Sequence, residues 1–154
     1  MTGGAVIVGV LCGLVIGVPL GLAIGAVFLR AACALYNFFA GGEKSPSSVP
    51  EPAFLKAMGI IFVTTLVNVV AGFGIGLVIG IGGLSIKFSQ QQTALVAQLL
   101  SLPIGLLVMA GMNAALLPTS FGKGLLVALC HLLIVVVVAA VIIGGVVLVI
   151  FLIG

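Results

Sequence analysis

Long apolar stretches without a charged side chain alternate with short polar segments along this chain. The four stretches cover about residues 4–29, 57–84, 93–117 and 124–153. Each is longer than the ~20 residues that an α-helix needs to cross a hydrocarbon layer of ~30 Å. None shows the alternation of apolar and polar residues over about ten positions that membrane β-strands require. The pattern therefore predicts an all-α integral membrane protein with four transmembrane helices in a single transmembrane domain, residues 1–154.

The polar segments between these stretches are short, which constrains how the helices connect. Residues 41–52 (GGEKSPSSVPEP) are rich in Ser, Pro and Gly, a composition that predicts an irregular soluble loop. Residues 85–92 and 118–123 form the other two connections. Short connections join antiparallel neighbours, so we expect the four helices to form two hairpins.

The two expected hairpins carry similar short motifs. Pro-x-Gly-Leu occurs at residues 19–22 and again at 103–106, and Phe-x-Lys occurs at 54–56 and again at 121–123. Since both hairpins would enter the membrane from the same side, an internal duplication would be parallel, with its pseudo-two-fold axis along the membrane normal. Chance similarity is the alternative, because the motifs are short and the composition is narrow.

The overall composition excludes a soluble domain. Hydrophobic residues make up 64% of the chain and charged residues 5%, and the mean hydropathy is +1.61, whereas soluble domains carry about 25% charged residues. The lipid bilayer is therefore the expected surrounding. The net charge of +3 comes from only five basic and two acidic residues. These form no clustered basic face, so no nucleic-acid partner is expected.

The few basic residues lie mostly on one side of the expected bundle. Four of them lie in or beside the first and third connections: Arg30, Lys44, Lys56 and Lys123. The second connection contains only Lys87. Because Lys and Arg are enriched in cytoplasmic loops, residues 41–52 and 118–123 are predicted to be cytoplasmic and both termini to lie outside the cytoplasm.

Glycines spaced by four residues mark two of the expected helices. The first helix carries Gly9, Gly13, Gly17, Gly21 and Gly25, and the second carries Gly72, Gly76 and Gly80. Residues four apart lie on one helix face, and a face without side chains lets another helix approach closely in a membrane. The first stripe resembles the glycine zippers of several membrane assemblies, including pore-forming ones. We expect both faces to be helix-packing surfaces.

Polar residues within the apolar stretches are the other candidate site. The candidates are the amides and the imidazole: Asn68, Gln98, Asn113 and His131. No Asp or Glu lies in these stretches, which argues against a transporter coupled to protons or cations. The four side chains either form hydrogen bonds between helices, His131 for example with Thr64 or Asn37, or line a pore. A metal site at His131 would need further ligands from other helices.

The sequence contains no motif for catalysis, so the protein is not expected to be an enzyme. No cofactor and no metal are expected either. The glycine faces favour a structural or accessory assembly subunit that associates with itself or with other membrane proteins. The alternative is a small channel or transporter for ions or neutral solutes. Convergence of the four polar side chains on one cavity would favour the alternative.

Overall fold

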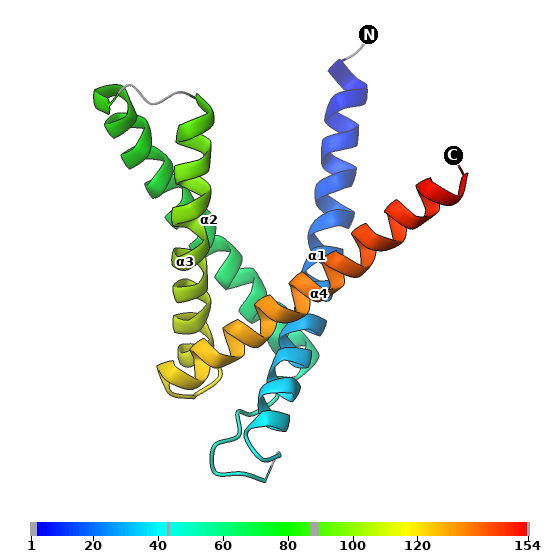
Figure 1. Ribbon diagram of the computed structural model, residues 1–154, viewed down its shortest axis with the longest axis vertical. Helices are drawn as coiled ribbons and strands as arrows, with labels where there is room; N and C mark the ends of the chain where they lie inside the picture. Colours follow the sequence, from blue (N-terminus) through cyan, green and yellow to red (C-terminus); the bar gives the residue numbers. More distant parts are fainter. Residues whose placement is uncertain (1–2, 43, 87–89, 154) are drawn as a thin grey trace.

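The computed structural model describes residues 3–42, 44–86 and 90–153, with the side chains of 3–12, 82–86, 90 and 93 outside the description. Its elements are four α-helices: α1 Gly3–Phe39, α2 Phe54–Ile86, α3 Gln90–Leu116 and α4 Phe121–Ile153 (Figure 1). All four are long and apolar enough to span a membrane. The structure therefore confirms the prediction of an all-helical chain with four candidate membrane spans.

The first helix is longer than the apolar stretch that predicted it. It continues past Arg30 to Phe39 and ends where Gly41 and Gly42 adopt φ values of +95° and +94°. Only glycine adopts this left-handed conformation without steric cost, so the pair is a suitable helix terminator. The Gly42 N–H donates to the carbonyl oxygen of Asn37 over 2.8 Å, which satisfies one of the last carbonyls of the helix.

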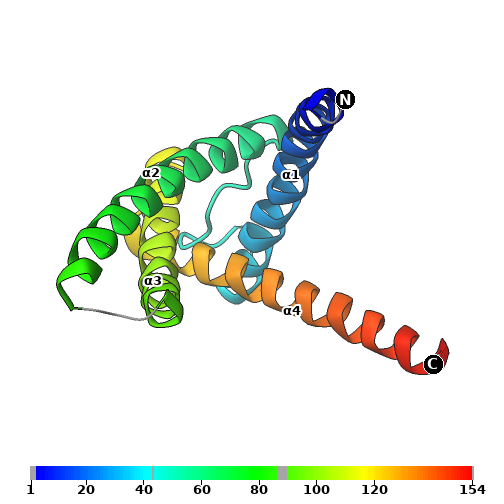
Figure 2. The same cartoon turned by 90° about the horizontal axis from the view of Figure 1, so that it is seen from above.

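The four helices converge at one end of the molecule and diverge toward the other (Figures 1 and 2). We call the end with the α1–α2 and α3–α4 connections the loop end. The helices diverge toward the end where both termini lie, which we call the open end. Each helix packs against two others: α1 against α2 and α4, and α3 against the same two.

The core lies near the loop end. Its buried residues come from α1, α2, α4, the first loop and the connection after α3: Ala26, Leu29, Ala32, Cys33, Tyr36, Val49, Ala57, Ile60, Leu117 and Val127. The partly buried Met109 and Leu116 of α3 pack against them. Toward the open end the helices expose large apolar side chains such as Val70, Val141 and Phe151. Such a surface suits lipid acyl chains, and packing between helices in lipid depends on close van der Waals contact.

Candidate functional site

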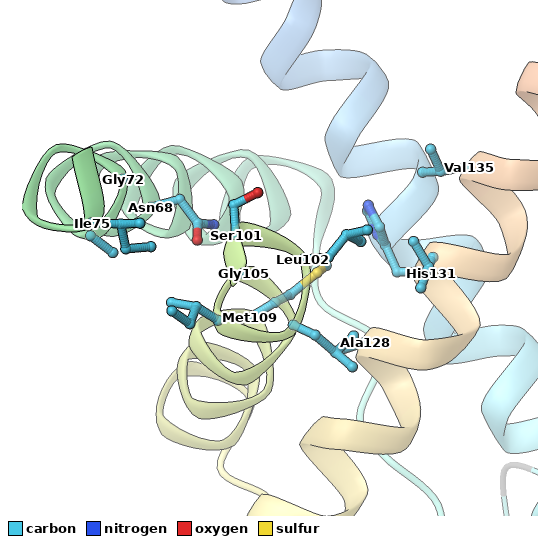
Figure 3. Close-up of a pocket in the computed structure, with 14 residues that line it drawn as sticks. Asn68, Gly72, Ile75, Ser101, Leu102, Gly105, Met109, Ala128, His131 and Val135 are labelled. Atoms are coloured by element: carbon cyan, nitrogen blue, oxygen red, sulfur yellow. The ribbon is translucent and has the colours of Figure 1, made fainter. Parts of the chain in front are cut away.

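A cleft of about 480 Å³ lies between α2, α3 and α4 (Figure 3). Most of its lining is aliphatic, and its polar side chains are Asn68 from α2, Ser101 from α3 and His131 from α4. The lining contains no charged side chain among the residues that the structure describes. The cleft therefore offers neutral hydrogen-bonding groups within apolar walls, the usual composition of a small-molecule site.

Asn68 lies where α2 approaches α3. Its Oδ1 atom would be 3.7 Å from a Cβ placed on Gly105, so the amide lies over bare helix backbone. Ser101 lies one turn before Gly105 in α3. Its hydroxyl donates to the carbonyl oxygen of Gln98 over 2.9 Å. The Ser101 oxygen can still accept a hydrogen bond. Figure 3 shows Asn68 and Ser101 on the same side of the cleft.

His131 forms part of the α4 wall of the cleft, across from Asn68 (Figure 3). Its ring lies edge-on to Phe28 of α1, with 6.3 Å between the ring centroids. The Nδ1 atom is buried and has no hydrogen-bond partner among the described residues. Neither suggested partner bonds this atom: Thr64 donates to the Ile60 carbonyl oxygen, and Asn37 bonds with Val49. A buried imidazole nitrogen without a partner is unusual in folded proteins.

The cleft brings together two of the four polar residues proposed from the sequence. Asn68 and His131 line it, whereas Gln98 is exposed outside it. Asn113 is 0% exposed and does not line the cleft, and neither of its amide atoms has a partner in the described part of the chain. Ser101 was not among the four candidates, although spacing by four places it on one face of α3 with Gly105 and Met109, which also line the cleft.

The glycine faces make few contacts within the chain. A Cβ placed on Gly13, Gly17 or Gly21 would meet no described atom within 4 Å. The same holds for the α2 face of Gly72, Gly76 and Gly80. At Gly25 the Cβ would lie 2.9 Å from the Ile61 side chain, so α1 and α2 touch at this point. The surroundings of Gly9 lie outside the described side chains.

Sequence reasoning did not anticipate a close helix approach at Gly124 in α4. A Cβ on this residue would lie 2.5 Å from the carbonyl oxygen of Ala110 and 3.0 Å from the amide nitrogen of Ala114, both in α3. Gly124 is buried. It belongs to no stripe of glycines, so its sequence context gave no signal for this role.

A second unanticipated feature is a clamp between α1 and the first loop. The Asn37 side chain donates to the Val49 carbonyl oxygen over 2.9 Å and accepts from the Val49 N–H over 2.8 Å. The Tyr36 hydroxyl donates to the Ser47 carbonyl oxygen over 3.1 Å. Lys123 Nζ donates to the Pro46 carbonyl oxygen over 3.3 Å, which joins the loop to α4. The first loop is therefore a folded cap on the loop end.

The chain matches no protein-family model, no curated protein and no solved structure.

Proposed function

We propose that this chain is a non-enzymatic membrane subunit that assembles with further copies of itself through the glycine faces of α1 and α2. The observation that carries the proposal is the open space beside six glycines: Gly13, Gly17, Gly21, Gly72, Gly76 and Gly80. Glycine inside a helix costs about 1 kcal/mol relative to alanine in peptide helices. Close approach of a second helix would offset this cost in lipid.

A second copy fits these faces better than an unrelated partner. The glycine face of α1, and likewise that of α2, can pair with the same face of a second copy. Such self-complementary pairing is how two-fold symmetric dimers form, the commonest oligomers. Another membrane protein is the alternative occupant, and the experiment below separates the two cases.

Self-association is expected to fall about fivefold or more in Gly17→Ile and Gly76→Ile, because a bulky side chain in a close-packed interface costs roughly 1–3 kcal/mol. The matched control is Gly74→Ile. Gly74 is also in α2 with no described atom within 4 Å of its Cβ, but it lies on a different face from Gly72 and Gly76. Light scattering of the detergent-solubilised protein across a concentration range measures the effect.

Three results would contradict self-assembly. The parent could be monomeric at every concentration. A different membrane protein would then be the expected partner of the glycine faces. The Gly74 variant could dissociate as strongly as the Gly76 variant. Liposome flux of ions or neutral solutes that is lost in Asn68→Leu would instead favour a channel or transporter. This second function is favoured by one observation, that Asn68 and His131 share a cleft.

The orientation in the membrane belongs to the same proposal. Residues 41–52 and 118–123 are cytoplasmic and both termini lie outside, because Arg30, Lys44, Lys56 and Lys123 flank or lie in these connections. Two hairpins, related by a parallel duplication, are the proposed architecture. The packing of α1 on α2 and of α3 on α4 supports the hairpins.

We expect Ser47→Cys to resist a membrane-impermeant thiol reagent in intact cells and Gln91→Cys to react with it. Both positions are exposed in the structure, so access to the reagent depends on the side of the membrane. The parent chain, which carries Cys12, Cys33 and Cys130, gives the background labelling. Permeabilised cells serve as the control in which both variants should react. The reverse pattern in intact cells would invert the proposed orientation.

A further inference from the structure

The cleft between α2, α3 and α4 has the chemistry of a site for a neutral ligand. Its polar groups are an amide, a hydroxyl and an imidazole, and its described lining carries no charge. A charged ligand would lose its hydration without gaining a counter-charge, which is strongly unfavourable at such a site. A neutral ligand with one or two hydrogen-bonding atoms would gain partners at Asn68, Ser101 or His131.

The position of the cleft favours a ligand that arrives from the lipid. Asn68 and Ser101 lie near the middle of α2 and α3, the depth at which a spanning helix is surrounded by hydrocarbon. On the loop side the buried core fills the space between the helices. Toward the open end the helices diverge (Figure 1) and expose apolar side chains. Acyl chains therefore have a path to the cleft between the diverging helices.

We propose that this cleft binds a neutral membrane lipid that carries a hydroxyl or carbonyl group, a diacylglycerol or a long-chain alcohol being the simplest kind. The polar group of the lipid lies at Asn68 and Ser101, where an amide donor and a hydroxyl acceptor are adjacent. Its chains extend from the cleft into the hydrocarbon that surrounds the helices. The cleft borders the α2 glycine face at Gly72. Lipid binding nevertheless goes beyond assembly, and the Gly105 substitution below tests it without changing either glycine face.

A photoreactive diacylglycerol, with a diazirine near the glycerol end of one chain, tests the proposal in phosphatidylcholine vesicles containing the full chain. We expect the cross-links, mapped by mass spectrometry, to concentrate on cleft residues of α2 and α3. Gly105→Leu places a side chain beside Asn68 and should remove most of this labelling. The matched control Gly111→Leu, in the same helix with no described atom within 4 Å of its Cβ, should keep it.

A second variant removes the chemistry without filling the cleft. Asn68→Leu should reduce diacylglycerol labelling of the cleft about fivefold, the effect expected for one lost hydrogen bond. A phosphatidylcholine that carries the same diazirine should label the outer helix faces and not the cleft. Labelling spread evenly over the outer faces, or unchanged in both Gly105→Leu and Asn68→Leu, would overturn the proposal. Equal labelling of the cleft by the phosphatidylcholine probe would also overturn it.

Discussion

Replacing Gly124 with alanine is expected to destabilise the folded chain by about 1–3 kcal/mol, the range measured for overpacked interiors. The added Cβ would lie 2.5 Å from the carbonyl oxygen of Ala110 and 3.0 Å from the amide nitrogen of Ala114. Both atoms belong to the backbone of α3, so no side-chain rotation can relieve the contact. The two helices would have to separate, and α4 would lose packing along its buried segment. Thermal unfolding in detergent measures the effect.

Gly111→Ala is the matched control for this prediction. It lies in α3 next to Ala110, and a Cβ there would meet no described atom within 4 Å. Alanine is favoured over glycine inside a helix by up to about 1 kcal/mol, so this variant should melt at or above the temperature of the parent. If Gly124→Ala melted as high as Gly111→Ala, the close approach of α4 to the α3 backbone at Gly124 would be contradicted.

The number and nature of the helices could be predicted from the sequence because both depend on composition alone. An uninterrupted apolar stretch of more than about 20 residues has few alternatives to a spanning helix. The expected stretch 57–84 falls within α2, Phe54–Ile86, and 124–153 falls within α4, Phe121–Ile153. The charge-free stretch stops before Arg30, but the apolar residues 31–39 that follow allow the helix to continue. α1 does so as far as Phe39, before the left-handed pair Gly41 and Gly42.

The helix contacts could not be predicted in the same way. Each helix is apolar nearly all round, so the periodicity that marks the inner face of a soluble helix is missing. Asn68 and Gly72, four residues apart in α2, both line the cleft. Spacing by four could not distinguish a glycine that meets a neighbour, such as Gly124, from those that face open space. That difference depends on where another helix passes, which local sequence does not encode.

The clamp at Asn37 leads to the second large effect. Asn37→Leu is expected to destabilise the loop end by about 2–4 kcal/mol, since a buried polar group without a partner costs roughly 1–3 kcal/mol. The substitution removes both hydrogen bonds to Val49, of 2.9 and 2.8 Å, and leaves the N–H and carbonyl of that residue without their partner. Asn37 and Val49 are both buried, so water cannot replace the amide easily. Faster proteolysis within residues 41–52 and a lower melting temperature measure the effect.

Arg30→Gln is the contrasting change at the same loop. Arg30 forms an ion pair with Glu51, with 2.7 Å between Nη2 and Oε1, but the two side chains are 42% and 36% exposed. Exposed pairs of this kind contribute about 0–1 kcal/mol, so this variant should resemble the parent in both measurements. If Arg30→Gln opened the loop and Asn37→Leu did not, charge pairing would hold the cap in place. We expect the larger effect from Asn37→Leu, because the buried hydrogen bonds to Val49 hold the loop in place. Only their loss leaves backbone groups unpaired away from water.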